Sequence, residues 1–218
     1  MLKPRVWRRR VLKVAVQGHE AEIESWAVVL GLSNRTIELA KQLLQRVVYR
    51  KVHSMSKSLL ALYAASIVTG EYIPLSLFIN KAPVRLSTGR ISVARIKPKL
   101  VRFDVKKRFG IELSVEKMIE VEVRGFCRLL KLDPMLCEAT TCVTLCTLDD
   151  IPYIIERNYA KYVLSIIRFV AKRLGISIRV TPFLPYNRRF SRLSTKKAEK
   201  YIDVCIERAR RAVAMQLQ

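Results

Sequence analysis

Apolar residues recur along the chain with the spacing of amphipathic helices, and one such pattern occurs twice. In residues 22–32 and again in residues 122–132, apolar side chains stand at i, i+3, i+4, i+6 and i+7, which predicts the buried stripe of a helix. The two segments align at an offset of 100 residues. The aligned pairs are Ile23 and Val123, Trp26 and Phe126, Ala27 and Cys127, Val29 and Leu129, Leu30 and Leu130, and Leu32 and Leu132.

Further helices follow in the same order in both halves. Ser33 and Asp133 come directly after the paired segments and are suited to cap the next helix. A third helix then ends at a glycine in each half, Gly70 and Gly175, because glycine accepts the left-handed conformation that closes many helices. The stretch 59–68 is apolar all round, which predicts the central helix of a bundle.

The tetrapeptide Arg-Leu-Ser-Thr also occurs twice, at 85–88 and at 192–195. Each copy follows an extended, proline-bearing stretch and precedes a basic segment that we interpret as a helix, 89–96 and 196–215. Such ordered correspondences are typical of an internal duplication, and no strand series is evident. The sequence therefore predicts an all-α fold. We expect three parts: a basic N-terminal arm (1–18), helical repeat 1 (19–110) and helical repeat 2 (111–218), the repeats being joined through 97–113.

The large excess of basic over acidic residues indicates a polyanionic partner. The chain has 41 Lys and Arg residues against 18 Asp and Glu, a formal net charge of +23. A net charge of roughly 2–8 keeps a small domain soluble, and a larger excess repels itself unless a partner of opposite sign is bound. Nucleic acid is the commonest such partner, because each neutralised phosphate releases counterions. An anionic membrane surface and an acidic protein are the alternatives.

Membrane and secretory signals are not evident in the sequence. The N-terminal residues are basic but include no uninterrupted apolar core. The longest apolar stretches, such as 59–68, are too short to cross a bilayer. We therefore expect an intracellular (cytoplasmic) protein with no membrane partner.

The chain offers little for catalysis or metal binding. Its cysteines are odd in number and contain no Cys-x-x-Cys pair, which argues against a disulfide framework and against a zinc site. His19 and His53 are isolated, and Glu22 has no histidine or cysteine partner in the pattern. We expect no enzyme, no metal and no cofactor, and interpret the three cysteines that share one apolar segment as small buried hydrophobes. The cysteines of the chain are Cys127, Cys137, Cys142, Cys146 and Cys205.

A set of short segments in the first half follows one another in a characteristic order: 30–33 (Leu-Gly-Leu-Ser), Ala40, 61–70, 74–78 and 87–95. In these residues the first half resembles the cyclin-like repeat of the transcription factor B family, the archaeal and eukaryotic factor that bridges TATA-binding protein, promoter DNA and RNA polymerase. The tandem arrangement matches as well, since that family carries two such repeats. Its zinc ribbon has no counterpart here, because no cysteine precedes Cys127.

The resemblance implies an all-α fold with five helices per repeat and a helix-turn-helix at the end of each repeat. The second helix of such a motif can enter the major groove of DNA. Carried over to this chain, the recognition helices would be 88–95 and 195–208. TATA-binding protein would be a possible partner, although the missing ribbon puts a complete role in initiation in doubt.

Three basic regions are candidates for nucleic-acid contact. In each, phosphates would position the protein and a few Arg or Lys side chains would read base edges. The C-terminal region gives Arg188, Arg189, Arg192, Thr195, Lys196, Lys197 and Lys200; the end of repeat 1 gives Arg85, Thr88, Arg90, Arg95, Lys97 and Lys99; the N-terminal arm gives Arg8, Arg9 and Arg10.

The leading hypothesis is a duplex-DNA-binding protein that acts in transcription, with RNA as a second possible ligand. One alternative is a structural nucleoprotein component, such as a viral capsid or ribosome-associated protein, whose basic helices coat nucleic acid without sequence choice. A cyclin-type module that binds another protein is a third hypothesis. Ordinary solvated basic faces would explain each charged segment without any function.

Overall fold

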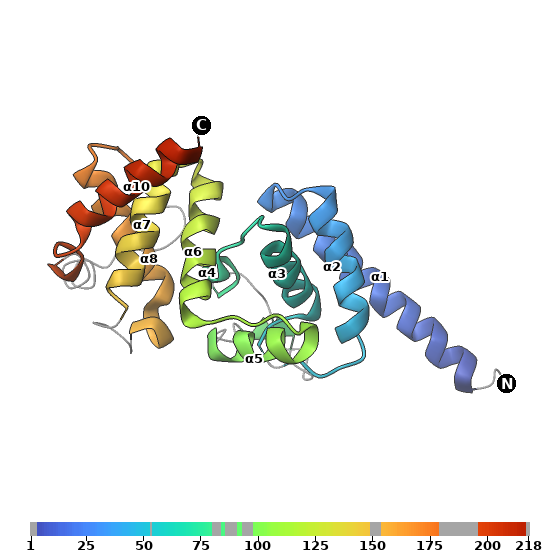
Figure 1. Ribbon diagram of the computed structural model, residues 1–218. Helices are drawn as coiled ribbons and strands as arrows, with labels where there is room; N and C mark the ends of the chain where they lie inside the picture. The colour runs from blue at the N-terminus through green and yellow to red at the C-terminus, as the bar shows by residue number, and fades with distance from the viewer. Residues whose placement is uncertain are drawn as a thin grey trace. The chain divides into compact units, whose positions relative to one another are not determined.

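The computed structural model describes residues 4–52, 54–79, 84–85, 91–92, 98–148, 154–178 and 196–216. The chain is built from helices, which confirms the predicted all-α class (Figure 1). A pair of two-residue strands adds a small antiparallel ladder that pairs Val84 with Ser92. The elements are α1 (Pro4–Leu30), α2 (Asn34–Val47), α3 (Lys57–Thr69), α4 (Leu75–Ile79), β1 (Val84–Arg85), β2 (Ile91–Ser92), α5 (Pro98–Phe109), α6 (Val115–Leu130), α7 (Pro134–Cys146), α8 (Ile154–Arg173) and α10 (Ile202–Gln216).

The chain divides into two compact units. Unit 1 comprises Met1–Glu71 and Phe78–Glu112, and unit 2 comprises Tyr72–Leu77 and Leu113–Gln218. The short segment that follows α3 therefore belongs to the second unit, although it lies within the first half of the sequence.

Unit 1 is organised around α3, as its apolar sequence predicts. Every residue of 58–66 is buried, and α1, α2 and α5 all pack against this helix. Ser56 caps the helix by accepting the amide hydrogen of Leu59, and Gly70 closes it with φ 78°. Phe78 is fully buried, with its ring centroid 5.6 Å from that of Trp26 in an edge-to-face arrangement, a geometry that aromatic pairs favour.

In each unit one helix packs on three others. The helix α7 packs on α6, α8 and α10, as α2 packs on α1, α3 and α5. The predicted caps are confirmed in both units, since Ser33 accepts from Thr36 and Asp133 accepts from Met135 and Leu136. Gly175 has φ 72°, close to the value at Gly70, which confirms the predicted glycine endings.

One residue of the predicted stripe faces solvent. Val29 is 76% exposed, while Ile23, Ala27 and Leu30 are buried. The helix advances by 100° per residue, so Val29 lies about 240° around the axis from Ile23 and falls outside the apolar arc. The apolar spacing predicted the helix correctly, but the prediction that Val29 is buried was wrong.

Three predicted segments have other backbones. Residues 4–18 of the predicted arm form the first half of α1, because no proline after Pro4 interrupts this run. Within the predicted helix 89–96, Ile91 and Ser92 form β2, in keeping with the preference of β-branched residues for strands. The predicted helix 196–215 is broken by a turn at 199–201, where the Tyr201 amide bonds to the carbonyl of Ala198 only three residues back.

The expectation about cysteines was wrong. Two disulfides join Cys127 to Cys137 and Cys142 to Cys205, leaving Cys146 as an exposed free thiol. The first links α6 to α7 and the second links α7 to α10. The Cα atoms of the pairs are 5.9 and 5.5 Å apart, within the usual range for a disulfide. An odd cysteine count does not exclude two bonds, because the fold decides which sulfurs meet.

Gly125 permits a close approach of backbone to α6. A Cβ built on Gly125 would lie 2.6 Å from the Cδ and 2.7 Å from the nitrogen of Pro74. Next to this contact, the buried carboxylate of Glu122 accepts the Leu75 amide at 2.7 Å. The segment 72–77 is thus held against α6 by a steric fit and a hydrogen bond.

We predict that Gly125→Ala lowers the free energy of unfolding by about 2 kcal/mol, because the methyl group must displace backbone atoms. Gly18→Ala is the matched control in α1, where nothing lies within 4 Å of the new Cβ. This control should gain about 0.5–1 kcal/mol from helix propensity. Urea unfolding followed by circular dichroism measures both, and equal effects of the two changes would contradict the fit.

A candidate nucleic-acid interface on α5

One face of α5 fastens the helix to unit 1. Val101 and Val105 are fully buried, and so is Asp104. The Asp104 carboxylate accepts the backbone amide hydrogen of Ser54 at 2.9 Å, and the Arg108 guanidinium donates to the carbonyl of Lys51 at 2.7 Å. Since Asp104 and Arg108 are four residues apart, both contacts come from the same side of the helix.

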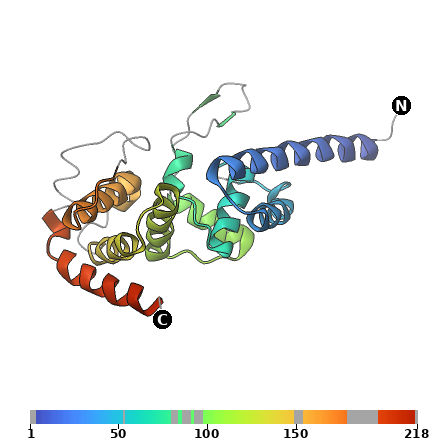
Figure 2. The same cartoon turned by 90° about the horizontal axis from the view of Figure 1, so that it is seen from above.

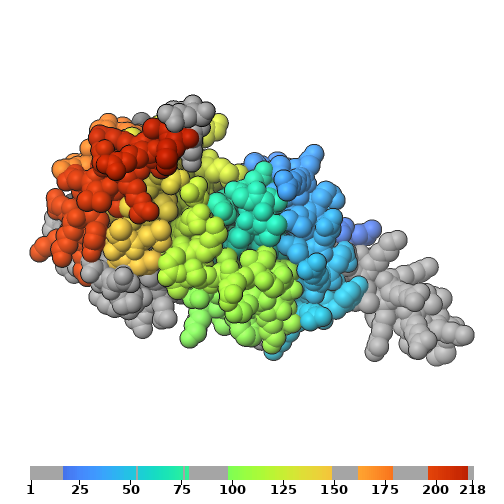
Figure 3. Space-filling model, in the orientation of Figure 1, coloured from blue at the N-terminus to red at the C-terminus, as the bar shows by residue number. Residues whose placement is uncertain are grey.

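The opposite face of α5 presents an aromatic ring among cations. Phe103 is 49% exposed, and the Nζ of Lys107 lies 5.0 Å from the centre of its ring. Lys99 and Lys106 are exposed on the same side, since their positions follow the helical repeat from Phe103. We call Lys99, Phe103, Lys106 and Lys107 the α5 surface; Figure 3 shows α5, in green, at the surface of unit 1.

The adjoining loop between α2 and α3 adds further charge. Arg50 and Lys51 are exposed, and Tyr49 beside them is 64% exposed. The hydrogen bond from Arg108 to Lys51 fixes this loop next to the end of α5. Basic side chains interleaved with exposed aromatics therefore come from two segments about fifty residues apart in sequence.

The α5 surface keeps most of its positive charge uncompensated. Among the described residues, none of the ion pairs involves Lys99, Lys107, Arg50 or Lys51. Lys106 is the exception, because it pairs with Glu112. The hydrogen bond and the charge of Lys106 hold the pKa of the Glu112 carboxyl below its ordinary value.

Elsewhere in unit 1, Lys41 has acidic partners. The Nζ of Lys41 lies 2.7 Å from Glu24 and 3.1 Å from Glu38. The hydrogen bonds to Glu24 and then to Glu38 raise the pKa of Lys41. Because its charge is already compensated by two carboxylates, Lys41 should attract phosphate less strongly than Lys99, which is in none of the ion pairs of the described residues.

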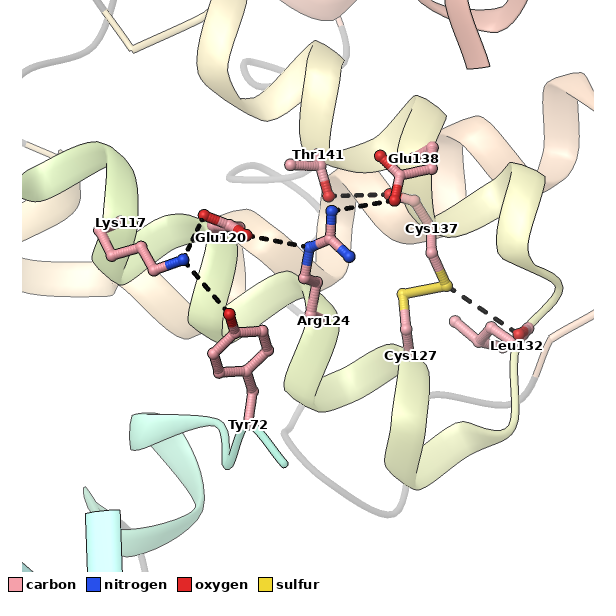
Figure 4. Close-up of polar contacts among 9 residues, drawn as sticks. All are labelled: Tyr72, Lys117, Glu120, Arg124, Cys127, Leu132, Cys137, Glu138 and Thr141. Carbon is pink, nitrogen blue, oxygen red and sulfur yellow. Dashed lines mark hydrogen bonds and ion pairs between the residues drawn. A yellow bond between two sulfur atoms is a disulfide. The ribbon is translucent and has the colours of Figure 1, made fainter. Parts of the chain in front are cut away.

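Unit 2 contains a chain of polar contacts in which Lys117 and Arg124 pair with carboxylates (Figure 4). Lys117 contacts the Tyr72 hydroxyl and Glu120, and Arg124 joins Glu120 to Glu138. Burial lowers the pKa of Lys117, but the hydrogen bonds to Glu120 and Tyr72 outweigh it, so this pKa lies above its ordinary value. These groups connect residue 72, α6 and α7, and we interpret them as structural.

The C-terminal helix carries a second basic face. Lys196, Lys200, Arg208 and Arg211 are exposed as predicted, whereas Lys197 is half-buried. Part of the charge on this side is compensated, since Arg210 pairs with Glu207 and Arg173 with Asp203. Val204 on α10 is 72% exposed.

The remaining predicted contact residues are described only in part. Arg85 lies in β1, and Arg8, Arg9 and Arg10 lie in the helix α1, where the structure describes the backbone alone. Lys99, from the predicted region at the end of repeat 1, has a described side chain and belongs to the α5 surface. Those outside the described residues are Thr88, Arg90, Arg95, Lys97, Arg188, Arg189, Arg192 and Thr195.

His19 and Glu22 have partners that the sequence pattern did not reveal. The Nδ1 of His19 lies 2.7 Å from the Ser58 hydroxyl, which donates to Glu22 at 2.6 Å. Ser58 is fully buried and lies between the other two groups. A serine nucleophile would instead donate its hydroxyl hydrogen to the histidine, and the carboxylate would bond to the other nitrogen of the histidine ring. We therefore interpret the cluster as a polar tie between α1 and α3.

Comparison with known proteins adds no relative. No protein-family model, curated protein or solved structure matches the chain. None of the helices in the described part of the chain is both long and apolar enough to cross a membrane.

Proposed function

We propose that this protein binds duplex DNA through the α5 surface and the adjoining loop of unit 1. The observation that carries the proposal is the exposed ring of Phe103 beside Lys99 and Lys107, neither of which has an acidic partner among the described residues. Phosphates attract such cations, and the release of condensed counterions supplies the free energy of binding. The net charge of +23 supports the same partner.

The two faces of α5 have different roles: one anchors the helix, and the other presents its lysines. Asp104 and Arg108 hold the inner face on the loop between α2 and α3, so the lysines of the outer face are presented on a fixed element. A fixed array of cations favours a rigid partner with regularly spaced phosphates, which is duplex DNA rather than a flexible single strand. Sequence choice would need base contacts, which this surface provides only through long Lys and Arg side chains.

The role in transcription rests on the resemblance to the transcription factor B family. We propose that the chain acts there as a DNA-binding body. A pull-down with purified TATA-binding protein on promoter DNA tests this part separately. Binding of the α5 surface to DNA with no recruitment by TATA-binding protein would favour a structural nucleoprotein component.

The binding site is tested by removing charge from it. We predict that Lys51→Gln, Lys99→Gln and Lys107→Gln together make the slope of log K against log salt less negative by about 3, one per lost phosphate contact. The control Arg35→Gln, Lys131→Gln and Lys172→Gln removes the same charge from other exposed positions. Fluorescence anisotropy with a duplex measures both slopes, and equal slopes for the two variants would refute the assignment.

Two further variants refine the test. Glu112→Gln removes the carboxylate that pairs with Lys106, so duplex affinity should rise and the salt slope should steepen by about 1. Phe103→Ala should change duplex affinity little, whereas stacking on a single strand would cost about 1–3 kcal/mol. A large loss for single-stranded ligands alone would turn the proposal toward RNA or single-stranded DNA.

A further inference from the structure

Three sulfur atoms meet where α10 packs on α7. Cys142 and Cys146 are one turn apart on α7, and Cys205 faces them from α10. The three Sγ atoms all lie within 4.8 Å of one another, and no other group of this kind occurs among the described residues. Figure 1 and Figure 2 both show α10 lying next to α7.

The cluster opens onto a pocket. Cys205 is buried, Cys142 is half-buried and Cys146 is exposed, so the sulfurs lead from the core to the surface. A hollow of about 230 Å³ lies over Cys142 and Cys146, and Glu138 and Arg208 line it too. A ligand bound to the sulfurs would therefore be reachable from solvent and would lie near a guanidinium.

We propose that, once the Cys142–Cys205 disulfide is reduced, Cys142, Cys146 and Cys205 bind one Zn²⁺ ion. Thiolates are preferred ligands of this ion, with Zn–S distances of about 2.3 Å. Tetrahedral geometry then places sulfurs about 3.8 Å apart. The unbonded pairs, at most 4.8 Å apart, need to approach by no more than roughly 1 Å, and the sulfurs of Cys142 and Cys205 must move apart once their bond is reduced. Three thiolates on Zn²⁺ leave one negative charge, which Arg208 can balance.

The fourth position of the ion faces the pocket. Three protein ligands and an open position are typical of zinc sites that bind water or a small ligand. The spacing of Cys142 and Cys146, with three residues between them, lies within the range seen in zinc sites. Cys205 comes from a distant segment, which explains why the site is not visible as a local motif.

A dithiol reduces the Cys142–Cys205 disulfide by thiol–disulfide exchange. The dithiol gives two electrons and two protons to the Cys142–Cys205 bond and becomes a cyclic disulfide, and the protein gains two thiols. Binding of Zn²⁺ by the three thiols then releases three protons to the buffer. In the oxidised chain, two of the three ligands are withheld, so the site is available only under reducing conditions.

Cobalt(II) is the spectroscopic probe for this site, added to reduced, oxygen-free full-length protein. The double variant Cys127→Ser, Cys137→Ser keeps only the three proposed ligands. We expect it to bind one cobalt ion per chain, with sulfur-to-metal charge-transfer absorption and intense tetrahedral bands. Zn²⁺ should displace the cobalt, bleach these bands and raise the melting temperature.

Cys146→Ser is the decisive variant, because Cys146 is exposed and takes no part in either disulfide. Added to the double variant, it should weaken cobalt binding by more than roughly 100-fold, the most that loss of an outer-shell partner usually costs. Circular dichroism checks that the helices remain. Unchanged affinity, a spectrum without sulfur ligation, or a reduced chain that loses its helices and binds no cobalt would each overturn the proposal.

Discussion

Replacing Cys142 and Cys205 together by serine should lower the free energy of unfolding of unit 2 by about 4 kcal/mol. The bond joins residues separated by 63 positions, and a cross-link of that span removes much of the conformational entropy of the unfolded chain. It also ties α10 to α7, its principal packing partner. Guanidinium unfolding of the oxidised proteins, followed by circular dichroism, gives the difference.

The second disulfide provides a matched comparison. Cys127 and Cys137 are only 10 positions apart, so the same double replacement there should cost about 3 kcal/mol. Both variants lose two sulfur atoms and one disulfide bond, and they differ mainly in the length of the loop that the bond closes. If the Cys142 and Cys205 variant were as stable as the oxidised parent, or if peptide mapping found these two cysteines unlinked, the cross-link would be ruled out.

Local signals explain what the sequence predicted well. Ser33 and Asp133 were recognisable as caps because their side chains bond to amides two or three residues away. Gly70 and Gly175 end helices for a reason contained in one residue. The buried helix α3 was evident because no polar face interrupts residues 59–65. Each of these features depends on neighbours within one or two turns.

The features that sequence reasoning missed depend on tertiary contacts. Cys205 meets Cys142 only because α10 packs on α7, and no local rule brings residues so far apart together. The strand at Ile91–Ser92 needs its partner at Val84–Arg85, so a basic segment judged by itself was interpreted as a helix. The His19, Ser58 and Glu22 cluster likewise joins two helices that are separate in sequence.

The candidate interface was predicted in part. Lys99 was included for its charge, whereas Phe103 and the loop residues Arg50 and Lys51 were overlooked. Phe103 did carry a signal, because Val101 and Val105 define the apolar stripe of α5 and Phe103 falls on the opposite side. A large apolar residue on a cationic face marks an interaction surface. The contribution of the loop required the hydrogen bond from Arg108 to Lys51.

Asp104→Ala is the variant that links the fold of unit 1 to its proposed function. Asp104 is fully buried and accepts the Ser54 amide, so truncation leaves a buried donor without this acceptor. We expect unit 1 to lose about 3 kcal/mol, the range for a buried hydrogen bond to a charged group. Asp104→Asn keeps an oxygen acceptor of the same shape and should lose less. Asp203→Ala, at an exposed ion pair, should stay within about 0.5 kcal/mol.

Asp104→Ala also separates two explanations of DNA binding, net charge and the placement of α5, because they predict opposite changes in affinity for duplex DNA. Removing Asp104 raises the net positive charge by one, so affinity for duplex DNA would increase if charge alone governed binding. We expect a decrease instead, because α5 loses a contact that holds its lysines beside the α2–α3 loop. Asp203→Ala changes the net charge equally and should leave affinity the same or slightly higher. Fluorescence anisotropy titrations with a duplex, at a temperature well below the unfolding transition of both variants, measure the two affinities. Equal gains in affinity for both variants would show that the position of α5 does not affect binding.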